Sequence, residues 1–363
     1  MTRFLLLCIA ASLVACDSRT ATTGDVQTSY SNIAADETVV FFRTAAWLDE
    51  AQQMWHVPVH GWIYEPQDSA ARKAFFTAVL ESEFNLVPDN ETEDNYTSRL
   101  NLLIADSERG KQIVVNLVGR SHVLPPSAEN GHFETTLVIP VVDIEKHAED
   151  AVLTLSAVTR PEESRSFYGE VLLIQPTGMS IISDIDDTVK ISNVTDKRSL
   201  LEHTFLLDFN AAPGMADLYD EWQLDGLSLH FVSSSPWQLY SPLVDFLDAS
   251  GFPLSALNLK PVRFRDETLF DLFKKGTETK PAAIEKILNI YPDRRFVLVG
   301  DSGEQDPEVY AELITRYPEQ VLEIYIRNVT GESADNDRFA SVFRNVEKSR
   351  WQLFDHPREL QLP

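Results

Sequence analysis

From Met179 onward, short apolar runs alternate with longer segments whose apolar residues recur at helical spacing. The runs predict strands at Ser180–Asp184, Leu227–Ser233, Leu257–Lys260, Arg295–Gly300 and Val321–Ile326. The segments between them open at prolines, which suit the first position of a helix: Pro213, Pro236, Pro281 and Pro307. Strands that alternate with helices form a parallel sheet covered by helices. We therefore predict an α/β fold for residues 178–363.

Residues 38–177 have a different character. Runs rich in Val, Ile, Thr and aromatic residues are separated by Gly, Pro, Asn and Asp, which is typical of short strands and turns. One helix is expected near residues 69–83. We predict a β-rich, sandwich-like domain in which no catalytic set of residue types gathers. His56 and His60 flank one strand and are interpreted as strand residues rather than metal ligands.

The first residues resemble a bacterial lipoprotein signal. Arg3 precedes a short apolar stretch, Phe4–Val14, which is below the roughly 20 residues that a membrane span needs. Leu13–Cys16 resembles a lipobox, so residues 1–15 are predicted to be a signal peptide and Cys16 to carry lipid. The alternative is an ordinary signal peptide with a chance cysteine. The only other cysteine, Cys8, would be removed, leaving no thiol for a disulfide or a zinc site.

The N-terminal signal also predicts a location. A lipidated chain would be anchored in the bacterial cell envelope, and Asp17 after the cysteine favours the inner membrane in enteric-type bacteria. Residues 16–37 are rich in small polar residues and are predicted to be a flexible tether. The net charge of -25 excludes non-specific binding to nucleic acid or to an anionic membrane by charge alone.

Residues that can do chemistry follow the predicted strands, where ligands bind in open α/β sheets. They are Asp184 and Asp186 after the first strand, Ser233 after the second, Asp301 and Asp306 after the fourth, and Lys280 at the start of the helix before it. Carboxylates clustered without Cys or His favour a hard cation, most commonly Mg²⁺, which would offset their repulsion. A lysine and a hydroxyl beside them suit a phosphate group.

This ordered set resembles the haloacid dehalogenase superfamily of phosphotransferases. Its D-x-D-x-T motif corresponds to Asp184–Thr188, its strand-ending hydroxyl to Ser233, its lysine to Lys280, and its G-D-x-x-x-x-D motif to Gly300–Asp306. The wording of "SDIDDTVKISNVTD", "PGMADLY" and "FVSSSPWQLY" further resembles the catalytic domain of the actin-patch type of phosphatidate phosphatase. This resemblance covers roughly Gly178 to Leu360 and extends weakly into the β-rich half. "SSSP" departs from it, since relatives often have asparagine in the second place.

The resemblance implies a Rossmann-like domain and a two-step phosphatase mechanism. Asp184 would be the nucleophile and Asp186 the general acid and base, with Thr188, Ser233 and Lys280 at the substrate. Mg²⁺ would be held by Asp184, Asp301, Asp306 and the backbone carbonyl of Asp186. The substrate would be phosphatidate or another lipid phosphate.

Simpler interpretations remain open for several of these residues. Asp306 alone can act as a helix cap, Thr188 can stabilise a turn, and Asp184 with Asp186 can form a solvated turn. Lysines other than Lys280 that could take its role are Lys260, Lys274 and Lys275. "GDSGE" resembles a serine-protease signature, but it stands between a strand and a helix in an α/β half. His203 and His230 are interpreted as structural.

Substrate size can also be predicted. The intervals where this superfamily inserts a cap, 189–227 and 236–279, have no room for a substantial extra domain, so we expect no large cap and an open aspartate rim. Trp237 and Tyr240 could rest at a lipid interface or pack in the core. The alternatives to a phosphatidate phosphatase are a phosphatase for sugar phosphates or phosphoproteins, and a non-enzymatic envelope binding protein.

Overall fold

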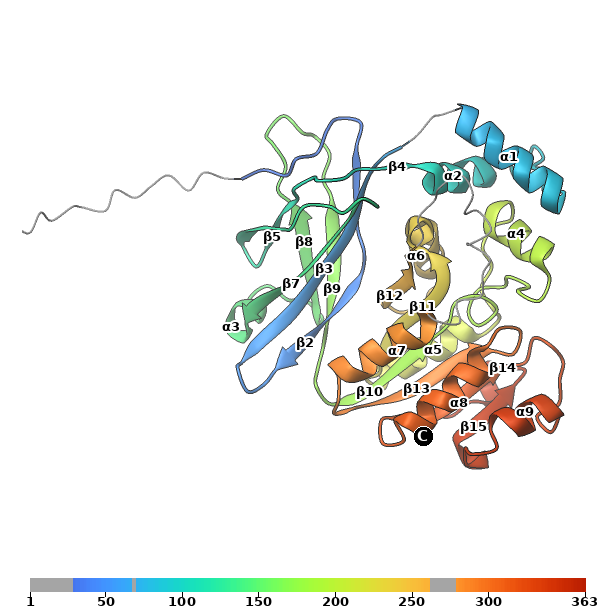
Figure 1. The fold of residues 1–363 in the computed structure, drawn as a ribbon. Helices are drawn as coiled ribbons and strands as arrows, with labels where there is room; N and C mark the ends of the chain where they lie inside the picture. The colour runs from blue at the N-terminus through green and yellow to red at the C-terminus, as the bar shows by residue number, and fades with distance from the viewer. Residues whose placement is uncertain (1–28, 67–69, 262–278) are drawn as a thin grey trace, which may run out of the picture.

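The structure is a computed structural model that describes residues 29–66, 70–261 and 279–363. The predicted signal peptide and Cys16 lie outside the described residues, and so do Lys274 and Lys275. Figure 1 shows the β-rich half beside the half that carries the parallel sheet.

Within the described C-terminal half, six strands form one sheet in which every pairing is parallel. The strands are β10 (Gly178–Ser183), β11 (Ser228–Pro236), β12 (Ala256–Lys260), β13 (Arg294–Asp301), β14 (Val321–Arg327) and β15 (Trp351–Phe354). Their order is β12-β11-β10-β13-β14-β15, the doubly wound arrangement with a switch point between β10 and β13. The predicted α/β fold and its first five strands are confirmed, whereas β15 was not predicted.

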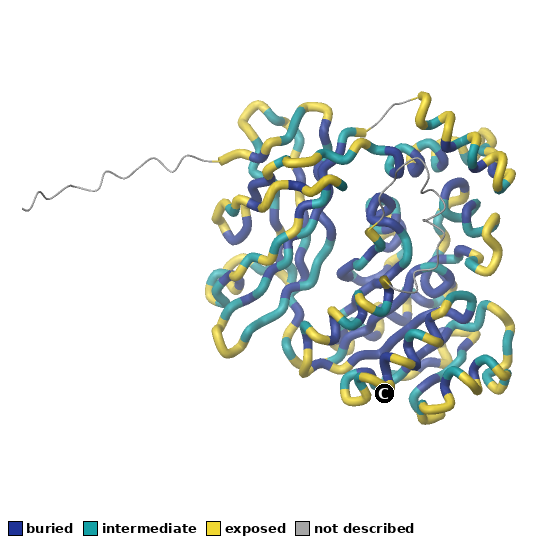
Figure 2. Tube along the Cα trace, in the orientation of Figure 1, coloured by how far each residue is buried: buried dark blue, intermediate teal, exposed yellow. Residues whose placement is uncertain are grey.

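Helices cover both faces of this sheet. They are α4 (Lys197–Phe205), α5 (Met215–Leu224), α6 (Tyr240–Ala249), α7 (Thr279–Ile290), α8 (Asp306–Arg316) and α9 (Asp337–Val342), with 3-10 turns η1 (Trp237–Leu239), η3 (Lys348–Arg350) and η4 (Pro357–Glu359). The apolar sides of α5 and α6 pack on one face, and those of α7, α8 and α9 on the other. Figure 2 shows the strands between them buried. No helix among the described residues is long and apolar enough to cross a membrane.

The β-rich half is a mixed, mostly antiparallel sheet. Its described strands are β1 (Thr38–Phe41), β2 (Thr44–Asp49), β3 (Met54–Glu65), β4 (Asp106–Ser107), β5 (Val114–Leu117), β6 (Arg120–Val123), β7 (His132–Pro140), β8 (Val152–Ala157) and β9 (Tyr168–Ile174). The long strand β3 pairs with β1, β2, β4 and β7, and β2 pairs in parallel with β9. A short helix, α3 (Val141–Ile144), follows β7.

Two helices interrupt the β-rich half between β3 and β4. The predicted helix near residues 69–83 is α1 (Ala70–Phe84), and a second helix, α2 (Glu93–Ile104), was not predicted. Helix α2 packs against α4 and η1 of the other half, and α1 packs against α2. Figure 1 shows both helices away from their own sheet.

The predicted tether over residues 16–37 extends too far. The Ser31 N–H donates to the Val158 carbonyl at 2.8 Å, and the Ser31 hydroxyl donates to the Val114 carbonyl at 3.0 Å. Glu37 is buried and forms an ion pair with Lys111. The sequence shows no apolar period here because these residues are held by polar contacts, so the packed β-rich half begins near Ser31.

The two halves share one apolar core. Phe42, between β1 and β2, stacks on Trp237 with ring centroids 4.2 Å apart, and both rings are buried. Arg43 donates its backbone N–H to the Tyr240 hydroxyl at 2.8 Å, and its guanidinium makes two bonds of 2.8 Å to Asp248 of α6. Trp237 and Tyr240 are therefore packing residues, and their suggested place at a lipid interface is wrong.

Candidate active site

The loop after β10 places Asp184 at the switch point of the parallel sheet. Asp184 directly follows Ser183, the last residue of β10. Its N–H donates to the Val299 carbonyl of β13 at 2.9 Å, so the loop begins where the two central strands diverge. The Thr188 hydroxyl donates to Asp184 Oδ2 at 3.2 Å and is fully buried. Thr188 thus orients the Asp184 carboxylate.

The third acidic residue of the loop, Asp187, has a structural role. It adopts a left-handed backbone conformation with φ of 55°. Its carboxylate accepts the backbone N–H groups of Ser192 (2.7 Å), Asn193 (2.9 Å) and Val194 (2.7 Å). These three hydrogen bonds offset the cost of burying the charge and fix the path of the chain after the D-x-D motif.

Lys280 neutralises part of the carboxylate cluster. It stands in the first turn of α7, where its buried Nζ lies 2.8 Å from Asp184 Oδ1 and 3.3 Å from Glu304 Oε2. Nζ also contacts Asp306 Oδ1, while Asp306 Oδ2 accepts the Asp301 N–H at 3.2 Å. Burial opposes the charge on Lys280, but Asp184, Asp306 and Glu304 raise its pKa well above the usual value. Of the candidate lysines in the described residues, Lys280 is the one placed at the aspartates.

Asp186 is held in a separate network of donors. Its Oδ1 lies 2.8 Å from Lys190 Nζ and accepts the Ser192 hydroxyl at 2.7 Å, and its Oδ2 accepts the Ser235 hydroxyl at 3.0 Å. The Ser233 hydroxyl also points to Oδ2, at 3.4 Å. Burial would raise the pKa of Asp186, but the Lys190 ammonium and these hydrogen bonds outweigh it and lower the pKa to about 2. Asp186 is therefore a carboxylate at neutral pH.

Three carboxylates form a group that fits a divalent cation. Asp184, Asp301 and Glu304 each offer an oxygen atom, and these atoms lie within 4.8 Å of one another. Asp301 Oδ1 accepts the N–H groups of Gly303 (2.6 Å) and Glu304 (3.0 Å). Asp301 Oδ2 is buried and has no hydrogen-bond partner among the described residues, so it is the atom that most needs a ligand.

The pKa values of these carboxylates fit a site that binds a cation. Burial raises the pKa of Asp184 well above its usual range, against the effect of Lys280. Burial, with the charges of Asp306 and Glu304, does the same for Asp301. Oxygen-only donors around uncompensated charge are the environment that Mg²⁺ and similar hard cations prefer.

The structure places the residues predicted from the sequence to form the site close to one another, but the roles of two acidic residues differ from the prediction. Asp306 contacts Lys280 and the backbone of Asp301, and Glu304 takes the place beside Asp184 and Asp301 that was expected for it. The aspartates are less accessible to solvent than the expected open rim would make them. Asp184 is only 1 % exposed, and the side chain of Asp186 is 13 % exposed.

Sequence reasoning missed Glu304, Lys190, Ser192 and Ser235. Glu304 had a detectable signal, since it follows Asp301 within the motif turn. Lys190 also had one, because it stands four residues after Asp186. Ser235 follows the motif serine by two residues at the end of the second strand, but no role was assigned to it. Nothing in the sequence singled out Ser192.

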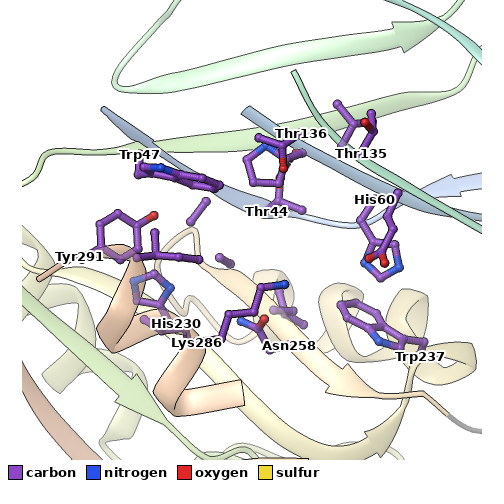
Figure 3. Close-up of a pocket in the computed structure, with 18 residues that line it drawn as sticks. Thr44, Trp47, His60, Thr135, Thr136, His230, Trp237, Asn258, Lys286 and Tyr291 are labelled. Atoms are coloured by element: carbon purple, nitrogen blue, oxygen red, sulfur yellow. Dashed lines mark hydrogen bonds between the residues drawn. The ribbon is translucent and has the colours of Figure 1, made fainter. Parts of the chain in front are cut away.

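A hollow whose lining includes none of these aspartates lies between the two halves. It has a volume of about 390 Å³ and is lined by Trp47 and Thr135 from the β-rich half and by Lys286 and Tyr291 from α7 and the turn that follows it (Figure 3). His60 is at one end, where its Nε2 lies 3.0 Å from His132 Nδ1. The His60 ring also packs edge-on against Phe42 and Trp237.

The comparison with known families bears on the half that carries the aspartates. Residues 179–328 match the family model described as "Phosphatidate phosphatase APP1, catalytic domain". The matched segment contains Asp184, Asp186, Ser233, Lys280 and the Asp301–Asp306 turn. A catalytic domain of this description implies a phosphatase.

Two relatives are similar to part of the chain. The chain is 33% identical over 208 residues to an uncharacterized protein of Schizosaccharomyces pombe, which covers 56% of this chain and 34% of that protein. It is 32% identical over 176 residues to phosphatidate phosphatase APP1 of Saccharomyces cerevisiae, which covers 45% of this chain and 28% of that protein. The similarity thus spans about a third of each relative.

Proposed function

We propose that the chain is a Mg²⁺-dependent phosphatase that hydrolyses phosphatidate to diacylglycerol and phosphate through an aspartyl-phosphate. The observation that supports this most is the position of Asp184. This carboxylate stands at the switch point of a doubly wound sheet, inside the segment that matches the phosphatidate phosphatase family, with Lys280 2.8 Å away. A nucleophile beside a cation that can also hold phosphate oxygens is what phosphoryl transfer to an aspartate requires.

In the first step, a carboxylate oxygen of Asp184 forms a bond to phosphorus as the bond between phosphorus and the alkoxide oxygen breaks. Asp186 takes up a proton from the entering phosphate monoanion or from solvent, and it passes that proton to the oxygen of the leaving alkoxide. Lys280 and Ser233 hold phosphate oxygens, and Thr188 keeps the Asp184 carboxylate aligned. Positioning of this kind supplies much of the rate of phosphoryl transfer.

In the second step, a water oxygen attacks phosphorus and the bond from phosphorus to Asp184 breaks, which releases phosphate. Asp186 removes the proton from that water, a role for which its ionised resting state is suited. Asp184, Asp301 and Glu304 would hold the cation, with the Asp186 carbonyl as the further ligand expected from the resemblance. When bound, Mg²⁺ supplies neutralisation of the phosphate charge and of the mutually repelling carboxylates.

Two observations favour a lipid substrate over a small soluble one. The matching family is named for phosphatidate, and the S. cerevisiae relative carries that name. In addition, the described part of the two intervals where a cap would be inserted contains only α4, α5, α6, η1 and β12. A phosphatase for sugar phosphates or phosphoproteins is the alternative that shares the same chemistry.

The test compares phosphatidate in mixed micelles with soluble sugar phosphates at matched Mg²⁺. We expect a higher kcat/KM for phosphatidate. A clear preference for a small soluble phosphate would remove the lipid assignment and leave the phosphatase chemistry. Absence of Mg²⁺-dependent phosphate release from every ester would instead favour the non-enzymatic envelope binding protein.

We also propose that Cys16 is lipidated and anchors the chain in the bacterial cell envelope, on the periplasmic side of the inner membrane. The proposal rests on the apolar stretch that ends in Leu13–Cys16 and on Asp17. An anchor of this kind would keep the phosphatase at the surface in which a lipid phosphate resides.

A further inference from the structure

Helix α2 of the β-rich half binds the flap of the catalytic half. The flap is the segment between the D-x-D motif and α5, and it contains α4. Asn95 of α2 donates its side-chain amide to the Leu206 carbonyl at 3.0 Å and to Asp208 Oδ1 at 2.9 Å. Asn95 and its helix therefore contact the residues that directly follow α4.

Arg99 makes the strongest of these contacts. It is buried, and its guanidinium donates to the carbonyls of Thr204 at 3.1 Å and Leu207 at 2.7 Å. Carbonyls at the end of a helix have no partner within the helix, so a buried cation there is favourable both as a donor and as a charge. Arg99 thus caps α4 from outside its own domain and fixes the chain just before Phe209.

A continuous set of contacts leads from Arg99 to Asp186. The guanidinium carbon of Arg99 lies 3.9 Å from the centre of the Phe209 ring, and Lys190 Nζ lies 4.8 Å from the same centre. One ring is therefore placed against two buried cations. Lys190 Nζ in turn lies 2.8 Å from Asp186 Oδ1.

Backbone hydrogen bonds also connect the flap to the residues around Lys190. The N–H of Ile191 donates to the Asn210 carbonyl at 2.9 Å, and the N–H of Ala212 donates to the Val189 carbonyl at 2.8 Å. The returning part of the flap is thus paired with the residues on either side of Lys190. A displacement of residues 204–209 would be transmitted to Lys190 by both the ring and the backbone.

We propose that Arg99 is a positioning residue for Asp186, supplied to the active site by the β-rich half. The inference rests on the proposed function, since it assigns Asp186 the acid–base role. Arg99 fixes the flap, the flap fixes Phe209 against Lys190, and Lys190 fixes the Asp186 carboxylate. A general acid that is displaced by a fraction of an ångström to an ångström loses much of its effect, by up to about 100-fold.

The experiment uses two phosphomonoesters whose leaving groups differ. The alkoxide of glycerol 3-phosphate needs a proton in order to leave, whereas the phenolate of p-nitrophenyl phosphate leaves without one. In Arg99→Met, we expect kcat/KM for the alkyl ester to fall by about 10- to 100-fold and that for the aryl ester to change by less than about threefold. A loss of folded protein alone would lower both by the same factor.

Two further variants complete the test. Phe209→Leu removes the ring between the two cations and should give the same selective loss, so the inference remains testable if Arg99→Met does not fold. Arg198→Met is the matched control, because Arg198 lies on α4 and its ion pair within the described part of the chain is with Glu202 at the surface; both esters should be unaffected. In an Asp186→Asn background, Arg99→Met should cause no additional loss with the alkyl ester.

The outcomes separate this inference from the proposed function. Equal losses with both esters, or an undiminished effect of Arg99→Met in the Asp186→Asn background, would overturn the positioning role while leaving the phosphatase in place. If the full-length wild-type chain with Mg²⁺ releases phosphate from neither of these esters nor from phosphatidate in mixed micelles, the proposed function and the positioning role both fall.

Discussion

Replacement of Lys280 by methionine should strongly destabilise the metal-free protein. The methionine keeps most of the apolar stem, so the change removes chiefly the ammonium. That ammonium is buried, 2.8 Å from Asp184 and 3.3 Å from Glu304, and in contact with Asp306. Removal of one partner from a buried ion pair leaves an uncompensated charge and costs about 3–5 kcal/mol. We expect the free energy of unfolding to fall by about this amount near pH 8.

The loss of unfolding free energy in Lys280→Met should depend on pH, and the carboxylates around Lys280 determine its direction. Burial already raises the pKa of Asp184 and of Glu304, and loss of Lys280 removes the opposing effect on both. A carboxyl group whose folded pKa exceeds its unfolded pKa destabilises the fold at high pH, and this is relieved as the pH falls through the folded pKa. The deficit of Lys280→Met should therefore shrink by up to about 1.4 kcal/mol per pH unit for each carboxyl group that takes up a proton.

Urea denaturation in EDTA, followed by tryptophan fluorescence at about pH 8 and about pH 5.5, measures both quantities. Lys286→Met, an exposed change on the same helix, is the control and should stay within about 0.5 kcal/mol of wild type. Adding Asp306→Asn to Lys280→Met should restore part of the loss, because one buried charge is then absent. A deficit below about 1 kcal/mol near pH 8, or one that grows toward low pH, would refute this account of the cluster.

The other predictions concern catalysis, pH and location. Asp184→Asn should abolish turnover because an amide cannot form the acyl-phosphate, and Asp186→Asn should lower it by about 10²–10⁴-fold; steady-state phosphate release checks both, and wild-type turnover in Asp184→Asn would end the covalent mechanism. Burial lowers the pKa of His60 to about 3, with His132 and Lys286 adding to it, and burial lowers the pKa of His132 to about 4. The unfolded chain then binds more protons than the folded chain below about pH 6.5, so the free energy of unfolding should fall as the pH drops toward 4. His132→Asn should make this fall with pH shallower by up to about 1.4 kcal/mol per pH unit. Denaturation curves that show the same pH dependence for the variant and the wild type would contradict this prediction. Cys16→Ala should release the protein from membranes, as measured by sedimentation after a salt wash, and complete retention would show that lipid is not the anchor.

The residues of the site could be predicted from the sequence because parallel strands place their carboxyl ends at one edge of the sheet. Asp184, Ser233 and Asp301 each follow an apolar run, and that rule alone brings them together. Lys280 followed from its place before the strand that ends at Asp301. The geometry of each contact was not readable, since it depends on loop paths such as the left-handed turn at Asp187.

The relation between the two halves was beyond sequence reasoning. The helix α1 was expected from its position between strand-like runs, but no local pattern shows that Arg99 of the following helix caps α4 across a domain boundary. The same holds for Trp237, which the sequence left open between a lipid interface and the core, because its partner, Phe42, is almost 200 residues earlier in the chain. Tertiary contacts of this length leave no periodic signal.

The common core of the two halves has a consequence for how the protein is made. Translation delivers the β-rich half first, and at about 5–20 residues per second the rest of the chain needs about 10–40 s more. During that interval Phe42, Trp62 and the apolar side of α2 lack the partners that later cover them, such as Trp237 and Phe205. The nascent chain must therefore be shielded from aggregation until its second half has been made. For the same reason, an exchange of one half between related proteins should succeed only where the matching side chains are exchanged with it.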